Sequence, residues 1–200
     1  MNTALRLAAS CTAMAAIGFA AVADEGADTY LKDLDIRQHA MVEEFASPPA
    51  SQGGGLAVEA AVDRANRVYT HGDHVVLTVK ATEDSYIWVF DTGTSGKAHQ
   101  IFPNRYDEEN FLKAGSTLHI PPAGSDYALA VSHPKGAELI TVVATKENTP
   151  LTPDLVDLDA GAGPFLALQG TADSVAKDLA ITLRRQEAAW TRDQVVILIE

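Results

Sequence analysis

The chain is poor in the residues that cross-link proteins or provide thiol chemistry. Only one of its 200 residues, Cys11, is a cysteine, and aromatic residues make up 6% of the sequence. One cysteine cannot form an intramolecular disulfide or a zinc site built from several thiolates. The fold must therefore depend on a hydrophobic core, and a chain of this length can form one.

Basic residues are also scarce. Lys and Arg together number 15 against 27 Asp and Glu, which makes the formal net charge −12 at pH 7. A strongly acidic protein repels the phosphate backbone of nucleic acids and the anionic headgroups of lipids. We therefore expect no nucleic-acid partner.

The sequence also lacks an apolar run long enough for a stable membrane-spanning helix. Near the start, the short run "LAASCTAMAAIGFAA" follows Arg6, and "AVA" at 21–23 precedes Asp24. This order is typical of a cleaved secretory signal. We predict a signal peptide at residues 1–23 and a soluble, periplasmic or secreted mature protein without cysteine. The alternative is a lipoprotein anchored at Cys11.

Two short regions come next. Residues 24–46 predict a short helix, because one apolar stripe recurs at helical spacing while acids occupy the other side. Residues 47–55, "SPPASQGGG", contain prolines and glycines that break regular structure and indicate a flexible linker. We interpret the helix as a tethered docking element for a groove on another protein, or else as a helix folded back on the main domain. Its stripe consists of Leu31, Leu34, Met41 and Phe45.

From residue 56 onward the hydrophobic period changes to two. The segments "LAVEAAV", "HVVLTVK", "SYIWVFD", "DYALAVS" and "AELITVVAT" alternate or run apolar, with Gly, Pro and Asp turns between them. Short strands at this spacing indicate an antiparallel β-sandwich of the immunoglobulin-like kind. We assign residues 56–200 to this mainly β domain.

A helix and a final strand are expected within the last 30 residues. In "TADSVAKDLAITLRRQ", Val175, Leu179 and Leu183 are four residues apart, and Thr171 is a suitable N-cap. The segment "AAWTRDQVVILIE" then ends in an apolar strand that carries Trp190. The predicted architecture is thus a sandwich with one short N-terminal helix and one C-terminal helix.

An ordered set of small motifs carries a family resemblance. The order is a tyrosine, Gly-Asp, an aromatic strand, Phe-Pro-Asn, Ala-Gly, Ile-Pro and a late Pro-x-Gly. Here the motifs are Tyr69, Gly72-Asp73, Tyr86 to Phe90, Phe102-Pro103-Asn104, Ala114-Gly115, Ile120-Pro121 and Pro134 to Gly136.

This order resembles a bacterial domain of unknown function, found in exported proteins and appended to kinases, caspase-like peptidases and secretion components. The resemblance runs from Val68 to Thr145 and resumes at Trp190. It implies a β-sandwich that works beside other machinery and supplies no catalytic residues.

The Phe-Pro-Asn motif predicts a corner at the end of a strand. Phe102 would fill the core, Pro103 would end the ladder, and Asn104 would bond neighbouring backbone. The acids that follow, Asp107 to Glu109, are interpreted as a solvated loop; the alternative is a patch for a cation or a partner.

A histidine-rich turn is the weak candidate for a metal site. His71, Asp73 and His74 lie within four residues and offer imidazole and carboxylate ligands. Against a metal, Gly72-Asp73 suits a structural turn, and adjacent strand residues point to opposite faces. We predict no metal and no cofactor.

Three aromatic residues share one face of a predicted strand, namely Tyr86, Trp88 and Phe90. We expect them to be buried and to form the core, so that Ile87 and Val89 would face a helix or solvent. The alternative is that the three rings are exposed and form a stacking platform for a sugar or a peptide, with Tyr86 and Trp88 as binding candidates.

The sequence shows no recognisable catalytic motif. Ser132 lacks the G-x-S-x-G elbow, and no carboxylate stands out with an apolar flank that would raise its pKa. We therefore expect a dry, apolar interior and no enzymatic activity. The expected function is protein–protein interaction or scaffolding with an envelope or secretion-associated protein. The alternative is a small-ligand or metal binder that uses the His71–His74 turn or the aromatic strand face.

Overall fold

The computed structural model describes residues 55–93, 95–132, 134–157 and 163–200, and these form a mainly β structure with one α-helix. The predicted signal peptide (1–23), the predicted helix (24–46) and nearly all of the predicted linker (47–55) lie outside the described residues. The elements are β1 (Val58–Val62), β2 (Val68–Tyr69), β3 (His74–Val75), β4 (Leu77–Ala81), β5 (Ser85–Thr92), β6 (Ala98–Phe102), β7 (Phe111–Leu112), β8 (Thr117–Ile120), β9 (Leu129–Ala130), β10 (Gly136–Thr145), the 3-10 turn η1 (Pro153–Leu155), β11 (Leu166–Ala167), α3 (Ala172–Arg185) and β12 (Trp190–Ile199).

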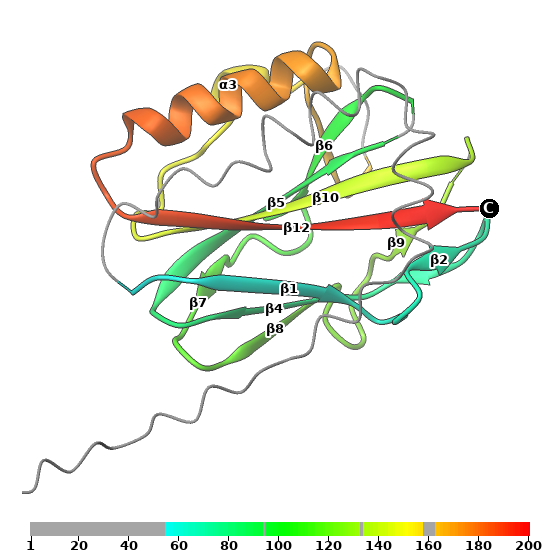
Figure 1. Cartoon of the computed structure of the whole chain (residues 1–200), viewed down its shortest axis with the longest axis horizontal. Coiled ribbons are helices and arrows are strands. Elements are labelled where there is room, and N and C mark those ends of the chain that lie inside the picture. Colours follow the sequence, from blue (N-terminus) through cyan, green and yellow to red (C-terminus); the bar gives the residue numbers. More distant parts are fainter. Residues whose placement is uncertain (1–54, 94, 133, 158–162) are drawn as a thin grey trace, which may run out of the picture.

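The strands form three sheets. The largest has the order β11-β6-β5-β10-β12-β2, with β7 paired to β5, while β1-β4-β8 and β3-β9 form smaller sheets. All pairs of named strands are antiparallel except β2 with β12, which pair in parallel. Figure 1 shows α3 over one face of the large sheet and β1-β4-β8 beneath the other. The expectation of several antiparallel sheets and one C-terminal helix is confirmed.

The main core lies between the large sheet and β1-β4-β8. On β4, Leu77 and Val79 point into it, as the period of two predicts, and neither is exposed. Ile140 and Val142 of β10 contribute to the same cluster from the large sheet. Because side chains alternate across a strand, β10 also presents Val143 to the opposite face.

A second core fills the space under α3. Val175, Leu179 and Leu183 are buried there, which confirms the predicted apolar face of the helix. Thr171 is the N-cap: its hydroxyl accepts a hydrogen bond from the Ser174 backbone N–H, and the Ser174 hydroxyl receives one from the Thr171 backbone N–H. This reciprocal cap satisfies two amides that the first turn leaves unpaired.

Strand β5 is buried on both faces, which reverses one detail of the sequence interpretation. Trp88 and Phe90 belong to the cluster under α3, whereas Ile87 and Val89 belong to the core between the sheets. The prediction placed the aromatic residues in the main core and the aliphatic residues toward a helix or solvent. Strict alternation cannot say which neighbouring layer each face will meet.

The Phe-Pro-Asn corner has the predicted form. Phe102 ends β6 with a fully buried ring. The buried Asn104 side chain donates to the Ile101 carbonyl and accepts from the backbone N–H groups of Tyr106 and Asp107. The side chain thus replaces ladder partners that the chain loses after the proline.

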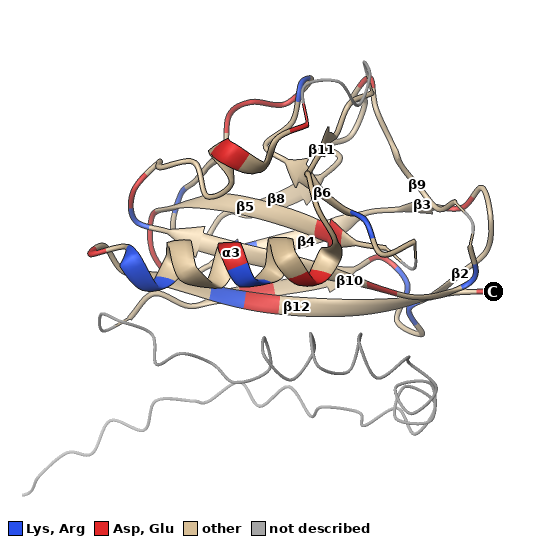
Figure 2. Ribbon diagram, turned by 90° about the horizontal axis from the view of Figure 1, so that it is seen from above, with Lys and Arg blue, Asp and Glu red and all other residues tan. Residues whose placement is uncertain are grey.

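Charged residues of both signs are spread over the loops, strands and α3 (Figure 2). Glu108 and Glu109 of the predicted solvated loop are exposed. Within the described part of the chain, no helix combines the length and the apolar character required to cross a membrane.

Candidate functional site

A cavity of about 260 Å³ opens beside the main core, toward the end of the large sheet where the β3-β9 pair lies. Four polar residues line it, Asp91, His99, Ser132 and Glu138, and Phe165 and Ala130 complete its wall. Ligand sites in proteins commonly combine apolar walls with a few convergent polar groups. The remaining lining residues are apolar: Val75, Ile101, Leu129, Val131, Ile140 and Ile197.

Strand register brings the polar groups of the cavity together. Asp91 on β5 lies opposite His99 on β6 and opposite Ile140 on β10. Glu138 precedes Ile140 by two residues and therefore projects from the same face of the sheet. Residues on three neighbouring strands thus meet at one point, although 47 positions separate Asp91 from Glu138 in the sequence.

A glycine makes room for the second carboxylate. A Cβ atom added to Gly93 would lie 3.1 Å from Oε1 of Glu138, tighter than ordinary packing allows. The Glu138 side chain therefore points toward the β5–β6 turn, where Gly93 N–H donates to the Lys97 carbonyl. This direction places the carboxylate at the same end of the sheet as Asp91.

The environment of Asp91 favours its protonated form. Burial, followed by the negative charge of Glu138, raises the pKa of Asp91 to about 8, against an opposing hydrogen bond from the Thr92 backbone N–H. The residue keeps intermediate exposure because it lines the cavity. Asp91 therefore holds a proton at neutral pH.

His99 does not supply a positive charge to balance the negative charge of the acids. Burial lowers the pKa of the His99 imidazole, and the positive charge of exposed Lys97 lowers it as well. The ring is consequently neutral at pH 7. The cavity can thus present a protonated carboxyl, a second carboxylate and a neutral imidazole to a ligand.

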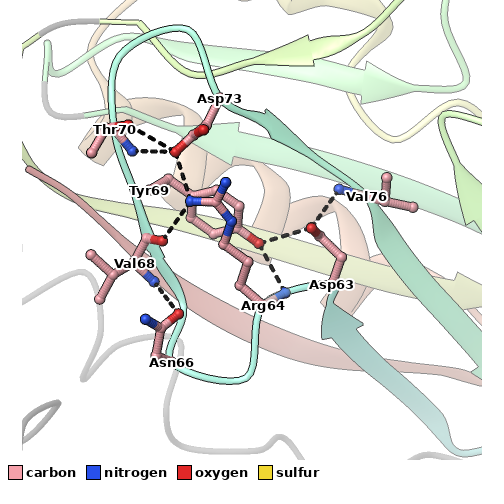
Figure 3. Close-up of polar contacts among 8 residues, drawn as sticks. All are labelled: Asp63, Arg64, Asn66, Val68, Tyr69, Thr70, Asp73 and Val76. Atoms are coloured by element: carbon pink, nitrogen blue, oxygen red, sulfur yellow. Dashed lines mark hydrogen bonds and ion pairs between the residues drawn. The ribbon is translucent and has the colours of Figure 1, made fainter.

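The candidate metal turn forms a different kind of site (Figure 3). Oδ2 of Asp73 accepts hydrogen bonds from Nη1 of Arg64 at 2.6 Å, from the Thr70 backbone N–H at 2.7 Å and from the Thr70 hydroxyl at 2.9 Å. The Arg64 hydrogen bond, followed by those from Thr70, holds the pKa of Asp73 well below its ordinary value. Asp73 is an ionised carboxylate with an established structural role.

Tyr69 extends this network into the core. Its ring is fully buried, its hydroxyl donates to Oδ1 of Asp63 at 2.9 Å, and the Arg64 guanidinium lies 4.7 Å from the ring centre. Burial, together with the hydrogen bond to Asp63, raises the pKa of Tyr69 to about 12. Asp63 also accepts from the Val76 backbone N–H, so the network ties β2 to the start of β4 (Figure 3).

The two histidines of the weak metal candidate lie on the surface. His71 and His74 are exposed, while the carboxylate of Asp73 is bound by Arg64 and Thr70. Over residues 55–93, 95–132, 134–157 and 163–200, no three His, Cys, Asp or Glu side chains gather as metal ligands. The three residues therefore form a turn that connects β2 and β3.

The two aromatic binding candidates separate in the structure. Trp88 is only 4% exposed, and its indole N–H donates to the Thr145 hydroxyl at 3.2 Å, so it offers no surface for stacking. Tyr86 is half-buried and contacts Phe111 edge to face, with ring centres 5.4 Å apart. The other four partner-binding candidates, Leu31, Leu34, Met41 and Phe45, lie outside the described residues.

Sequence reasoning missed the acid pair at the cavity. The alternation of side chains along the strands could have revealed it. Asp91 lies two residues after Val89 and Glu138 two residues before Ile140, so each projects from the face that carries these core residues. Our statement that no carboxylate has an apolar flank was wrong for Asp91, which follows "YIWVF". That the two acids are neighbours depends on the β5–β10 register.

Comparison with known proteins yields one finding. No curated protein and no solved structure matches the chain. One family model matches a segment that runs from β2 to just beyond β10 and includes Asp73, Asp91, His99 and Glu138. The match does not reach β12, where the resemblance was expected to resume. The matching segment, residues 68–148, is similar to the family described as a domain of unknown function (DUF4384).

Proposed function

We propose that this chain is a non-catalytic, exported binding module of the cell envelope, periplasmic or secreted, and that it receives its ligand in the Asp91 cavity. The cavity is the observation that carries the proposal, because apolar walls surround a small group of polar side chains. The ligand is a small molecule, or a side chain that an envelope or secretion-associated partner inserts.

The signal-like residues 1–23 support export, and so does the resemblance of the sequence motifs to a bacterial domain of exported proteins. We favour binding over catalysis because the sequence around Ser132 lacks the G-x-S-x-G motif of a nucleophilic serine. We further propose that the large sheet and β1-β4-β8 constitute an immunoglobulin-like β-sandwich, which the core between them supports.

A thermal-shift screen of small amines, alcohols, carboxylates and sugars tests the cavity. We expect at least one class to raise the melting temperature in a concentration-dependent manner, as mass action requires of a ligand that binds only the native state. Ala130→Phe adds a ring to the cavity wall and should abolish the shift. Ala123→Phe, at an exposed alanine outside the lining, is the matched control and should retain it.

Two results would count against cavity binding. One is a screen in which no compound raises the melting temperature at millimolar concentration. The other is a shift that survives in Ala130→Phe as fully as in Ala123→Phe, since the ligand would then bind elsewhere.

A second candidate is docking on an envelope protein through the exposed aromatic pair. Phe111 is 45% exposed and lies against Tyr86, so an apolar surface remains open at the β5–β7 pair. Phe111→Ser should reduce cross-linking to a partner, whereas the control Ile181→Ser, at an exposed apolar site on α3, should not. Equal cross-linking by both variants would exclude this surface.

A further inference from the structure

A β-bulge decides which side chain lies opposite Asp91 at the cavity. The register of β5 with β6 shifts by one residue between Val89 and Phe90. This shift sets His99 opposite Asp91, where an unbroken register would set Gln100. Residues directly opposite each other in an antiparallel pair project from the same face, and both Asp91 and His99 line the cavity. Bulges often direct a side chain into a functional site in this way.

The polar ends of this pair have hydrogen-bonding capacity that the described residues leave unused. The Asp91 carboxyl accepts a hydrogen bond from the Thr92 backbone N–H. Among the described residues, no side chain forms a hydrogen bond with the Asp91 carboxyl or with the His99 ring. Polar groups that lose water without gaining partners cost free energy, and a ligand that supplies the partners relieves this cost.

Both groups are uncharged at neutral pH. Burial, followed by the negative charge of Glu138, raises the pKa of Asp91 to about 8, and burial lowers the pKa of His99. Asp91 therefore offers an O–H donor and a carbonyl acceptor. The neutral His99 ring offers an N–H donor on one nitrogen and an acceptor on the other. Two adjacent groups that each donate and accept match a ligand that does both.

The surroundings of the pair favour an uncharged ligand. The charged and titratable groups that face Asp91 are Glu138 on β10 and His99 on β6, with exposed Lys97 beyond His99. An anion would find no Lys or Arg among the described residues that line the cavity, and a cation would require the buried Asp91 to ionise. Strand β12 and the β3-β9 pair contribute uncharged lining residues, namely Ile197, Val75 and residues 129–132.

We infer that the cavity binds a carboxamide group on a short apolar body, with Asp91 and His99 as its hydrogen-bonding partners; this rests on the proposed function, whose ligand it specifies. A primary amide has a carbonyl acceptor and two N–H donors. Its carbonyl accepts from the Asp91 O–H while one N–H donates to the Asp91 carbonyl, and the second N–H remains for the acceptor nitrogen of His99. Glu138 takes no part in these contacts. An alcohol has only one donor and cannot satisfy both side chains.

The rest of the cavity suits a short hydrocarbon chain. A volume of about 260 Å³ corresponds to roughly nine water molecules at their share of liquid volume. This suits a short aliphatic amide or the end of a glutamine side chain. Ile101, Ile140 and Ile197 line the cavity and would contact the methylene groups of the ligand. Phe165, whose ring centre lies 6.0 Å from that of Tyr127, adds an aromatic wall.

Binding should depend on pH in a defined direction. The contact requires the Asp91 proton, so affinity should be highest near pH 7 and should fall above about pH 8, by up to about tenfold per unit. Binding at pH 9 should take up close to one proton, because most Asp91 carboxyls are ionised in the free protein at that pH. Dissociation constants measured at pH 7, 8 and 9 report this fall directly.

NMR titration of the purified protein with butyramide and three matched probes tests the inference. The probe 2-pentanone has the same size and carbonyl but no N–H, butyrate carries a negative charge and n-butylamine a positive one. We expect butyramide to bind at least about fivefold more tightly than 2-pentanone at pH 7, because the ketone loses the hydrogen bonds that the amide donates. Butyrate and n-butylamine should bind more weakly than butyramide.

Two substitutions of Asp91 should have opposite results. Asparagine donates and accepts as a protonated carboxyl does but cannot ionise, so Asp91→Asn should keep the butyramide preference and bind equally at pH 7 and pH 9. Asp91→Leu removes both the donor and the acceptor and should abolish the preference. Glu108→Leu makes the same change at an exposed acid, and it should retain the preference and the pH dependence of the wild type.

A further probe, Nα-acetyl-glutamine methylamide, distinguishes the two sources of the carboxamide. Binding tighter than that of butyramide assigns the site to a glutamine side chain of a partner, and weaker binding assigns it to a free amide. Both results support amide recognition if binding falls in Asp91→Leu. Binding of this probe and of butyramide that is unchanged in Asp91→Leu would overturn it.

The remaining outcomes separate amide recognition from the proposed function. Equal affinities for butyramide and 2-pentanone, both lost in Ala130→Phe, would overturn amide recognition and leave the cavity as a binding site. Tighter binding of n-butylamine or butyrate than of butyramide would have the same consequence. Failure of every probe and of the broader thermal-shift screen would remove both proposals.

Discussion

Two aspartates of this domain occupy opposite electrostatic situations. Asp73 is held by an arginine, a backbone amide and a hydroxyl, and its pKa lies well below the ordinary value. Asp91 has a carboxylate for a neighbour, and its pKa rises to about 8. The comparison teaches that the same side chain stabilises a turn where donors converge on it and destabilises a sheet where they do not.

The two regions also touch. The Asp73 backbone carbonyl accepts a hydrogen bond from the Val131 N–H, and the Val131 carbonyl accepts one from the Gly72 N–H. Val131 is part of the cavity wall. The turn that holds Asp73 therefore supports one wall of the cavity that Asp91 and Glu138 line.

The largest expected effect comes from Asp91→Asn, which removes the ionisable group. Because the pKa of Asp91 is raised in the folded state, wild-type stability is present at low pH and falls as pH rises from about 4 to about 8. The variant should gain on the order of 2–5 kcal/mol at pH 8, the upper end being the full pKa difference at about 1.4 kcal/mol per unit. Urea unfolding at pH 5 and pH 8 measures this gain.

The increase in the free energy of unfolding of Asp91→Asn over the wild type should be clearly smaller at pH 5, where the wild-type carboxyl is protonated. Glu108→Gln should change stability little at either pH, as is usual for exposed sites. An equal gain at both pH values would show that ionisation of Asp91 is not the cause.

Asp73→Ala should act in the opposite direction. The change removes the acceptor of three hydrogen bonds, and we expect the melting temperature at pH 7 to fall by roughly 3–6 °C. Because the pKa of Asp73 is lowered in the folded state, its contribution is present above about pH 4 and is lost as pH falls below that value.

Thermal melts of wild type and Asp73→Ala at pH 7 and pH 3 compare the two conditions. The two curves should approach each other at pH 3. A difference that stays constant between pH 7 and pH 3 would mean that packing, rather than charge, explains the loss.

Glu138→Gln tests how much of the raised pKa of Asp91 is due to burial and how much to the charge of Glu138. Burial is the larger cause and the Glu138 charge the smaller, so the pKa of Asp91 should fall by about 1 and remain above its ordinary range. Carbon-13 NMR titration of the Asp91 carboxyl measures this directly. A fall to the ordinary value of an aspartate would show that repulsion, not burial, dominates.

The smallest expected effect is that of Tyr69→Phe, which deletes one hydroxyl from the Asp73 network. Loss of the hydrogen bond to Asp63 should cost about 1 kcal/mol at pH 7. Because the pKa of Tyr69 is raised to about 12, its contribution is present below about pH 10 and lost as pH approaches 12.

Ultraviolet titration of phenolate absorption should show a late-ionising tyrosine in the wild type that is missing from Tyr69→Phe. If the wild type and the variant give the same late phase, the assignment to Tyr69 is wrong.

Local sequence rules recovered several elements well. Thr171 as the N-cap, the buried row of Val175, Leu179 and Leu183, and the Phe102–Asn104 corner all depend on residues within a few positions of one another. Such features follow from backbone hydrogen bonding and helical spacing, and these operate without knowledge of the rest of the fold. Their confirmation in the structure is therefore expected.

Features that join distant strands were missed or reversed. The parallel pairing of β2 with β12 joins residues about 130 positions apart, and no local pattern announces it. Trp88 packs under α3 and Ile87 packs between the sheets, the reverse of the prediction. Alternation shows that two residues lie on opposite faces of a strand, but it does not show which layer covers each face. The metal interpretation of the His71–His74 turn likewise could not include Arg64, which supplies the partner of Asp73.

By itself, the sequence determined the period-two strands, the capped amphipathic helix and the turn residues, because propensity and spacing act over a few residues. The tertiary structure alone decided which strands became neighbours, and hence that Asp91 meets Glu138 and that Asp73 meets Arg64. The charge state of a carboxyl depends on the groups within a few ångströms of it, and strand register sets those groups across long stretches of chain.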